Sequence, residues 1–469
     1  MLDQKLQEQI DSFVEKNRNQ IVETVRALVQ IDSLRGAPLP GAPYGAGPRR
    51  ALDRALAICK EQGLSVADHE GYCGSAVLPG QEGEIALAAH LDIVPVGEGW
   101  SVDPFSATLR DGYIVGRGAR DNKGAFAADL YAMLCLRELG VPLRHSLRLI
   151  MGCNEETGMK DMEYYLSKNK APDFTLVTDC SFPVCHGEKG GFSGDIMFPK
   201  PARVRRAGGG VARNIVPAQA SAEVDCQGLD KERILALAGE AEGICAKMEG
   251  DTLTVSAEGI SFHAAFPEGS KNAIGRLLRF LCGAGLLEGE DFERGRFLAD
   301  TLEHYYGETL GIACADAQTG KLTCVGGLLF EESDGLHLNL DIRYPVTASG
   351  GKIGKKIAAA CKEHGCSFVV TKDDAGTYVP ADHPAVQTLC RVYRELTGSG
   401  RAPYTMGGGT YARKFPNAVA FGPGDPEEKL PYEPGRGDAH QPDESQNIGI
   451  LLRSIKIYVA AILELDKIL

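Results

Sequence analysis

The sequence predicts an α/β protein: a split domain with a mixed, largely parallel sheet between helices, plus an inserted α+β domain. At 469 residues the chain is too long for one compact core, so two domains are expected. Strands and helices alternate through the first part of the chain, which is typical of a sheet covered by helices on both faces. The pattern changes to short alternating strands near residue 191 and changes back near residue 382. We therefore expect one domain from residues 1–190 and 382–469, and an inserted domain from residues 191–381.

Apolar periodicity and turn residues predict the elements of the first part in order. Residues 3–32 have a helical period that is interrupted near Asn17, which predicts either two helices or one kinked helix. Gly63 is a typical C-terminal stop for a helix over residues 50–62. The same reasoning predicts strands at 75–78, 85–89, 113–115, 146–151 and 174–177, with helices at 125–139 and 161–168.

The inserted domain and the C-terminal part follow the same rules with different spacing. In the insert we expect strands at 196–198, 253–257, 322–329 and 336–344, and helices at 231–247, 272–281 and 354–364. After residue 382 we expect a helix at 385–396, a strand at 418–421 and a last helix at 446–468. No repeat of fixed period is visible in the sequence.

Charge and cysteine usage narrow the class of protein. A net charge of −13 argues against nucleic acid or an anionic membrane surface as a partner. The first 35 residues contain no apolar segment typical of a secretory signal, and no apolar run is long enough to span a bilayer. The 14 cysteines are scattered and form no Cys-x-x-Cys pair, which favours free thiols. These features together predict a cytoplasmic protein.

Polar side chains follow several of the predicted strands. The apolar stretch from Ala86 ends in His90 and Asp92, whose side chains point to the same face because strand residues alternate. Reactive groups of α/β sheets collect at the carboxyl ends of the strands. We expect to find His90, Asp121, Glu155 and Asp179 at such strand ends.

These residues, with Glu156 and His440, predict a metal centre. Two imidazoles and three carboxylates suit a pair of divalent ions, with zinc expected first and manganese or cobalt as alternatives. Such a pair needs a bridging carboxylate and a bridging water, while the adjacent glutamate can act as a base. Each residue has an ordinary explanation by itself: a solvated helix start for Glu155 and Glu156, a turn for Asp121, a cap for Asp179 and a loop for His440. The combination in this order favours the metal centre.

Four motifs together resemble the dinuclear metallopeptidases of the aminoacylase and carboxypeptidase group, which includes acetylornithine deacetylase and succinyl-diaminopimelate desuccinylase. The motifs are His90-Leu91-Asp92, Gly116 to Gly124, Asn154-Glu155-Glu156-Thr157-Gly158 and His440-Gln441-Pro442-Asp443-Glu444. The segments 214–217, 262–269 and 406–413 resemble one branch in particular, the bacterial peptidase V type dipeptidases, which are carnosinase-like and cleave Xaa-His dipeptides. The resemblance covers nearly the whole chain.

The resemblance implies a role for each residue of the centre. Asp121 bridges the two metals, His90 and Asp179 complete one site, and Glu156 and His440 complete the other. Glu155 is the general base, and Asp92 orients His90. The resemblance also implies a cis peptide bond between Asp121 and Asn122.

The inserted domain is expected to act as a lid that recognises substrate. By the same resemblance, Asn214, His263 and Arg343 reach onto the substrate, where His263 and Asn214 could hold the oxyanion. Arg343 offers a planar fork for the carboxylate of a dipeptide, and Gly408, Gly409 and Thr410 could add donors to it. A strand-edge salt bridge is the alternative for Arg343, and a flexible turn is the alternative for the glycine run.

The function that these features predict is that of a monomeric, metal-dependent dipeptidase, in which a water bridging two divalent ions attacks the peptide bond of a small dipeptide. One alternative is an amidohydrolase of the same family that acts on N-acyl amino acids. A more distant alternative is a metal-binding or peptide-binding protein without activity.

Overall fold

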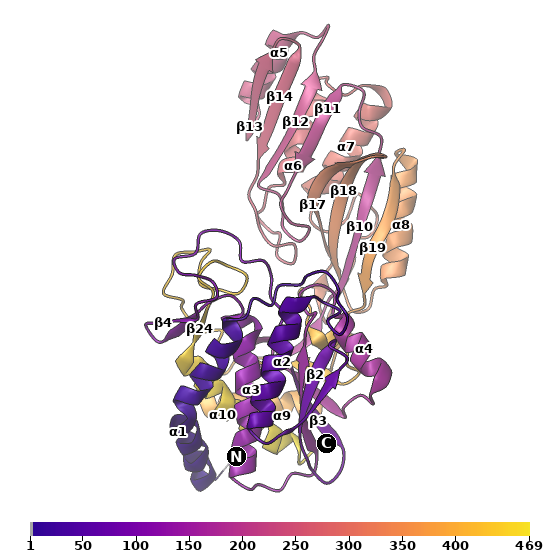
Figure 1. The fold of residues 1–469 in the computed structure, drawn as a ribbon. Helices are drawn as coiled ribbons and strands as arrows, with labels where there is room; N and C mark the ends of the chain where they lie inside the picture. Colours follow the sequence, from indigo (N-terminus) through magenta and orange to yellow (C-terminus); the bar gives the residue numbers. More distant parts are fainter. Residues whose placement is uncertain (1–2) are drawn as a thin grey trace. The chain divides into compact units, whose positions relative to one another are not determined.

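The computed structural model describes residues 3–469, and residues 1–2, with which the first predicted domain begins, lie outside the described part. The chain folds into two compact units, which Figure 1 shows coloured along the sequence. The first unit contains Met1–His186, Val379–Tyr404 and Thr410–Leu469. The second unit contains Gly187–Tyr378 together with the short segment Thr405–Gly409, which the sequence assigned to the split domain.

A mixed sheet forms the centre of the first unit. Its strands have the order β1-β2-β6-β3-β7-β22, and the short strand β9 continues it. The four strands β6, β3, β7 and β22 are parallel to one another, whereas β2 is antiparallel to both of its neighbours, β6 and β1. The bounds are β1 Ser65–His69, β2 Cys73–Leu78, β3 Glu84–His90, β6 Ser146–Gly152, β7 Phe174–Val177, β9 Cys185–Glu188 and β22 Ala418–Ala420. The predicted parallel character is confirmed for this central part.

Smaller strand pairs surround this sheet. Strands β4, β5 and β24 form a separate three-stranded sheet, and β8 pairs with β23. Strands β20 and β21 pair with β9 near the points where the chain passes between the units. The bounds are β4 Thr108–Arg110, β5 Tyr113–Val115, β8 Cys180–Ser181, β20 Thr377–Tyr378, β21 Tyr404–Met406, β23 Pro423–Gly424 and β24 Ser445–Asn447.

The helices of the first unit bury one face of the sheet and part of the other. Helix α3 is buried all round because it lies between the sheet on one side and α1 and α10 on the other. On the opposite face of the sheet, the ring of Tyr165 in α4 packs edge-to-face against His69. The ring of His69 in turn contacts Ser75. The bounds are α1 Gln4–Val29, α2 Ala46–Glu61, α3 Gly124–Glu138, α4 Lys160–Lys168, α9 Pro384–Thr397 and α10 Ile448–Leu465. No helix in the described residues is long and apolar enough to cross a bilayer.

The predicted interruption near Asn17 is wrong. Helix α1 continues through this residue from Gln4 to Val29. The side chain of Asn17 donates to the carbonyl oxygen of Phe13, one turn earlier, at 2.8 Å. A polar residue in a helix interior can satisfy itself in this way without ending the helix.

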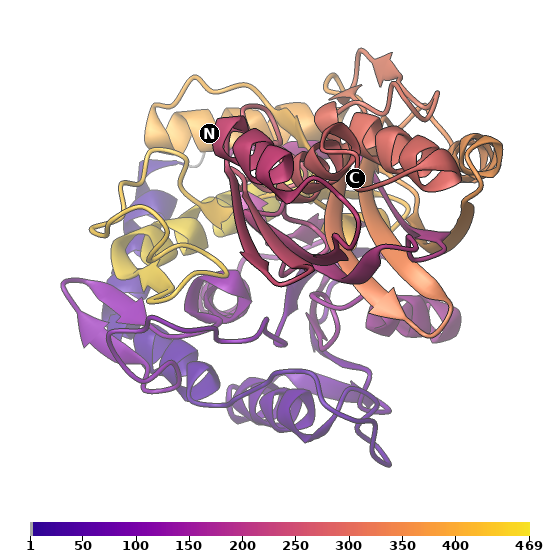
Figure 2. The ribbon, with the colours of Figure 1, turned by 90° about the horizontal axis from the view of Figure 1, so that it is seen from above.

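The second unit is a two-layer α+β structure. Its eight strands are antiparallel in the order β13-β14-β12-β11-β17-β18-β10-β19. One apolar core joins the sheet to α5, α6, α7 and α8, and Figure 2 shows these helices gathered over the strands. The bounds are β10 Gly190–Phe198, β11 Val204–Gly209, β12 Gln219–Asp225, β13 Ile244–Glu249, β14 Thr252–Glu258, β17 Thr323–Glu332, β18 Gly335–Tyr344, β19 Ser367–Asp374, α5 Lys231–Glu240, α6 Ala273–Gly283, α7 Gly289–Glu303 and α8 Gly350–Glu363, with the small pair β15 Ala315–Asp316 and β16 Gly320–Lys321.

The helix expected at 231–247 is too long. The structure ends α5 at Glu240 and begins β13 at Ile244. Gly243, at φ +70°, lies between them in the left-handed region that glycine adopts readily. The short apolar run after this glycine continues the helical period by coincidence, and the pairing of β13 with β14 decides in favour of a strand.

Asp129 on α3 is a fully buried carboxyl group. Its Oδ2 accepts a hydrogen bond from the hydroxyl of Thr178 at 2.7 Å, whereas its Oδ1 has no hydrogen-bond partner among the described residues. Burial raises the pKa of Asp129 well above its usual value, and the hydrogen bond from Thr178 offsets only part of this effect. The native state therefore holds a proton that the unfolded state releases.

We expect Asp129→Asn to stabilise the protein increasingly as the pH rises. Because the folded-state pKa lies above the unfolded one, the wild type loses stability relative to the variant by about 1.4 kcal/mol per pH unit between the two pKa values. Urea unfolding at pH 5 and pH 8 measures this difference. An equal difference between variant and wild type at the two pH values would mean that Asp129 is ionised in the folded protein.

Candidate metal centre

The parallel strands bring most of the predicted residues to one edge of the sheet. Strand β3 ends at His90, β6 ends at Gly152 just before Glu155 and Glu156, and β7 ends at Val177 just before Asp179. Because these strands are parallel neighbours, their carboxyl ends lie side by side. This part of the sequence-based placement agrees with the structure.

Asp121 reaches the centre by a different route from the one predicted. The strand before it, β5, belongs to the separate three-stranded sheet and not to the central sheet. A tight turn at Ala119–Lys123 follows and leads directly into α3. The expected cis peptide bond between Asp121 and Asn122 is present in this turn. The position of Asp121 therefore depends on this turn and on α3.

The two predicted histidines meet on the carboxylate of Asp121. His90 Nε2 lies 2.8 Å from Oδ1 of Asp121, and His440 Nε2 lies 2.9 Å from Oδ2. His90 Nε2 also lies 3.8 Å from Asp179 Oδ2, and His440 Nε2 lies 3.2 Å from Glu156 Oε1. The structure thus brings together all five residues that we expected to bind metal.

Burial and the attraction between imidazole and carboxylate groups act in opposite directions on the pKa values of Asp121 and His440. Burial alone would raise the pKa of Asp121, but hydrogen bonds from His440 and His90 outweigh it and hold the pKa far below its usual value. Burial alone would lower the pKa of His440, but its hydrogen bonds to Asp121 and Glu156 raise the pKa to about 11. Burial, followed by the nearby charge of Asp179, raises the pKa of Glu155 well above its usual value.

The donor atoms fit a pair of divalent cations. Two sets of three residues each place their ligand atoms within 4.8 Å of one another. One set is His90, Asp121 and Glu156, and the other is His90, Glu155 and Asp179. Imidazole nitrogen and carboxylate oxygen are ligands that zinc, manganese and cobalt accept. An imidazole nitrogen must be unprotonated to bind a metal, so cations and protons compete for these histidines. Glu155 lies close enough to be a ligand as well as a base.

Asp92 supports the centre through main-chain contacts that the sequence did not predict. His90 Nδ1 lies 3.0 Å from the main-chain oxygen of Asp92 and 3.5 Å from its Oδ1. The carboxylate itself accepts the amide N–H of Glu155 at 3.0 Å and that of Glu156 at 3.2 Å. Asp92 is fully buried, so these contacts are shielded from water. Asp92 therefore holds the Glu155–Glu156 turn as well as His90.

Several supporting residues were missed from the sequence. Buried Asp161 accepts the amide N–H groups of Cys153 and Asn154 at 2.7 and 2.8 Å, and it also accepts the hydroxyl of Tyr411. Asn122 donates to Asp179 Oδ1 at 2.9 Å. Tyr411 is distant in sequence from Asp161, so no local pattern could reveal this contact, whereas Asp161 lies only seven residues after Asn154. Asn122 stands next to Asp121, and an amide in that position was a usable signal.

In the second unit, Asn214 and His263 lie on adjacent segments. The amide N–H of Ala264 donates to the Asn214 carbonyl at 2.9 Å, and Asn214 Nδ2 lies 3.5 Å from His263 Nε2. His263 Nδ1 accepts the amide N–H of Ala265 at 3.1 Å, so a neutral ring carries its proton on Nε2. The amide of Asn214 and the ring of His263 therefore stand side by side.

Of the other residues predicted to bind substrate, Arg343 and Thr410 already have hydrogen-bond partners. Arg343 Nε and Nη2 bind the two carboxylate oxygens of Asp341 at 2.7 and 2.9 Å, which is the salt bridge foreseen as the alternative for this residue. Gly408 and Gly409 belong to the segment that joins the second unit. Thr410, which belongs to the first unit, uses its hydroxyl to accept the amide N–H of Ala412 at 3.1 Å.

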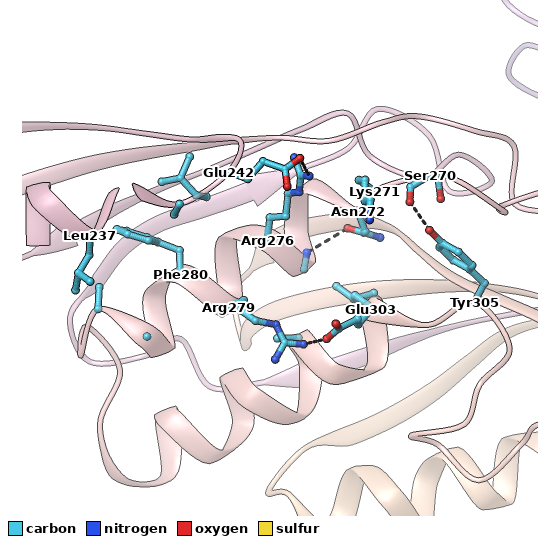
Figure 3. A pocket seen from close by; sticks show the side chains of 17 residues that line it. Leu237, Glu242, Ser270, Lys271, Asn272, Arg276, Arg279, Phe280, Glu303 and Tyr305 are labelled. Carbon is cyan, nitrogen blue, oxygen red and sulfur yellow. Dashed lines mark hydrogen bonds and ion pairs between the residues drawn. The ribbon is translucent and has the colours of Figure 1, made fainter. Parts of the chain in front are cut away.

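A cavity of about 500 Å³ in the second unit contains none of the predicted site residues. It lies between α6, α7 and the start of β13. Figure 3 shows Arg279 paired with Glu303 at one side of it and Tyr305 bound to Ser270 at another. Two of its arginines are paired with acidic side chains, Arg276 with Glu242 and Arg279 with Glu303.

Comparison with known proteins agrees with this geometry. Residues 86–464 match Peptidase family M20/M25/M40. The protein YtjP of Bacillus subtilis (strain 168) is 32% identical over 472 residues, covering 96% of this chain and 98% of that protein. The Beta-Ala-Xaa dipeptidase of Lactobacillus delbrueckii subsp. lactis is 30% identical over 472 residues, covering 97% of this chain and 98% of that protein. Human carnosine dipeptidase 1 shares the fold, with a TM-score of 0.60 at 16% identity over 98% of this chain and 100% of that one.

The chain belongs to the M20/M25/M40 peptidase family. It is therefore an enzyme that hydrolyses peptide bonds, as the sequence predicted.

We expect Asp92→Asn to lower kcat by about 10–100-fold, because an amide offers only one acceptor oxygen to the two N–H groups of Glu155 and Glu156. Steady-state kinetics at saturating metal measure the change. Asp173→Asn is the matched control. Asp173 also accepts a main-chain N–H, that of Glu84, but it does so at the start of β3, whereas Asp92 follows the end of β3. Equal loss in both variants would show that Asp92 acts only on stability.

Proposed function

We propose that the protein is a metal-dependent dipeptidase that binds two divalent cations between His90, Asp179, Asp121, Glu156 and His440. The observation that carries the proposal is the pair of histidines on opposite oxygens of Asp121, with Glu155 beside them. A shared carboxylate of this kind suits two cations held close together. The resident cations would polarise the substrate carbonyl and lower the pKa of bound water.

Glu155 has the properties of the general base. It lies within reach of the His90 and Asp179 ligand atoms, and burial raises its pKa, which favours proton uptake by this carboxylate. We infer that Glu155 takes the proton from the attacking water and delivers it to the leaving amine. The turn that carries Glu155 is fixed by Asp92 and Asp161, which keeps its carboxylate in one orientation.

The donor pair of the second unit suits the developing oxyanion. Nε2–H of His263 and the amide of Asn214 stand 3.5 Å apart and can both donate to one oxygen. This role requires the second unit to meet the first over the substrate. We propose that residues 1–190 and 382–469 form the catalytic domain, and that residues 191–381 form the lid that makes this contact.

The substrate is proposed to be a dipeptide with a free carboxylate. The relative from Lactobacillus delbrueckii is named for β-alanyl dipeptides, which supports this class. Arg343 is the cation proposed for the carboxylate, and Asp341 keeps its guanidinium in a fixed plane. Gly408, Gly409 and Thr410 are proposed to border the same end of the substrate.

Zinc is the proposed resident cation, with manganese or cobalt as alternatives, because the centre mixes imidazole with carboxylate ligands. None of the 14 cysteines, all of which lie in the described residues, forms a disulfide, and burial raises the thiol pKa of ten of them. This supports a reducing cytoplasmic location. We propose that the enzyme acts as a monomer, and light scattering of the purified protein tests this.

We expect Glu155→Ala to reduce turnover of dipeptides at least about 10³-fold, because the proton transfer loses its base, while two cations per chain are retained. Activity on a panel of dipeptides, β-alanyl dipeptides and N-acetyl or N-succinyl amino acids gives the rate, and elemental analysis gives the metal content. Glu163→Ala, in an exposed residue of α4, is the control. Loss of a cation from Glu155→Ala would make this residue a ligand, and turnover confined to the N-acyl substrates would show an amidohydrolase.

We expect Arg343→Met to raise KM for dipeptides about 10–100-fold with a smaller change in kcat, because the contact is to a group remote from the scissile bond. Dipeptide amides, which lack the terminal carboxylate, should be affected little. An equal rise of KM for the amides would assign Arg343 to the structural salt bridge alone.

A further inference from the structure

Arg117 and Glu444 form a buried ion pair between the two segments that carry Asp121 and His440. The side chains of both residues are almost completely shielded from solvent, and Arg117 Nη1 lies 2.6 Å from Glu444 Oε2. The guanidinium carbon stands 5.2 Å from the ring centre of Trp100, which covers it as a cation–π contact. Neither residue is among the predicted ligands, so the cost of burying these charges calls for an explanation.

Arg117 binds the main chain of the loop that carries His440. Its Nη2 donates to the carbonyl oxygen of His440 at 3.3 Å, and its Nη1 donates to that of Gln441 at 3.3 Å. Nη2 also donates to the carbonyl oxygens of Pro95 and Val96 at 3.2 and 3.0 Å. The loop itself has no helix or strand, and His440 has a positive φ of 66°. The side chain of Arg117 therefore fixes the position of the loop that carries His440.

Glu444 binds the main chain of the turn that carries Asp121. Its Oε1 accepts the amide N–H groups of Arg120 and Asp121, both at 3.0 Å. These contacts leave its Oε2 for Arg117. The ion pair thus joins the Asp121 amide to the His440 carbonyl through two side chains, next to the main-chain hydrogen bond from Gly116 to Glu444 and the pairing of β5 with β24.

We propose that Arg117 and Glu444 are positioning residues that set the separation between Asp121 and His440, and with it the affinity of the cation held by Glu156 and His440. This inference rests on the proposed metal centre and extends it. Hydrogen-bonded groups behind metal ligands commonly change metal affinity by about 10–100-fold when they are altered. Because His90 and Asp179 do not contact Arg117, the cation on their side should depend on it much less.

The test is Arg117→Lys, which keeps the charge but has a single nitrogen in place of the planar fork. Titration of the metal-free protein with Mn²⁺, followed by calorimetry, should show one cation bound with wild-type affinity to within about threefold and the other weakened by about 10–100-fold. His440→Ala shows which of the two cations is bound more weakly, because this variant removes a ligand of the proposed Glu156–His440 site directly. Excess Mn²⁺ should restore most of kcat in Arg117→Lys.

A matched control and a second variant separate positioning from stability. Arg148→Lys alters another ion pair of the first unit, that of Arg148 with Glu84, and should leave both Mn²⁺ affinities unchanged. Glu444→Gln leaves a single acceptor oxygen for Arg117 and for the amides of Arg120 and Asp121, so it should weaken both cations, the His440 one more; it replaces Arg117→Lys if Arg117→Lys does not fold. Unchanged or equally weakened Mn²⁺ affinities in Arg117→Lys would overturn the proposal. Because the titration needs no substrate, absence of dipeptide turnover in the wild type would overturn the proposed function and leave this result standing.

Discussion

The meeting of two imidazoles on one carboxylate is the constraint on which the rest of the structure depends. His90 comes from the central strand of the sheet, Asp121 from a turn before the buried helix α3, and His440 from a loop near the C-terminus. Without cations, only hydrogen bonds and opposite charges can hold these groups together, and the remaining carboxylates repel one another. The surrounding fold must therefore supply the positional restraint.

Main-chain hydrogen bonds to buried carboxylates supply that restraint. Asp92 and Asp161 each accept two neighbouring amide N–H groups of the segment from Cys153 to Glu156, and Glu444 does the same for the turn at Asp121. Hydrogen bonds to a charged acceptor in a shielded place are stronger than those between neutral groups. The fold thus controls the ligands through their backbone, so the ligand side chains are left to bind metal.

The sequence predicted the parts of this site that local patterns encode. The buried run of β3 ending at His90 and the strand before Asp179 could be read directly, because parallel strands are apolar along their whole length. The origin of Asp121 could not, because β5 looks like any short strand and its pairing with β24 joins distant parts of the chain. Arg117 and Tyr411 were missed for the same reason: their partners are distant in sequence and are decided by tertiary packing.

The placement of Asp121 directly before α3 connects the chemistry of the centre to the core of the first unit. Helix α3 is packed on all sides and begins at Gly124, so it cannot shift without carrying the turn at Asp121 with it. A cavity between α3 and α10, even far from any ligand, would therefore let α3 shift and would displace the bridging carboxylate of Asp121. Metal binding in this enzyme therefore depends on how well its hydrophobic interior is packed.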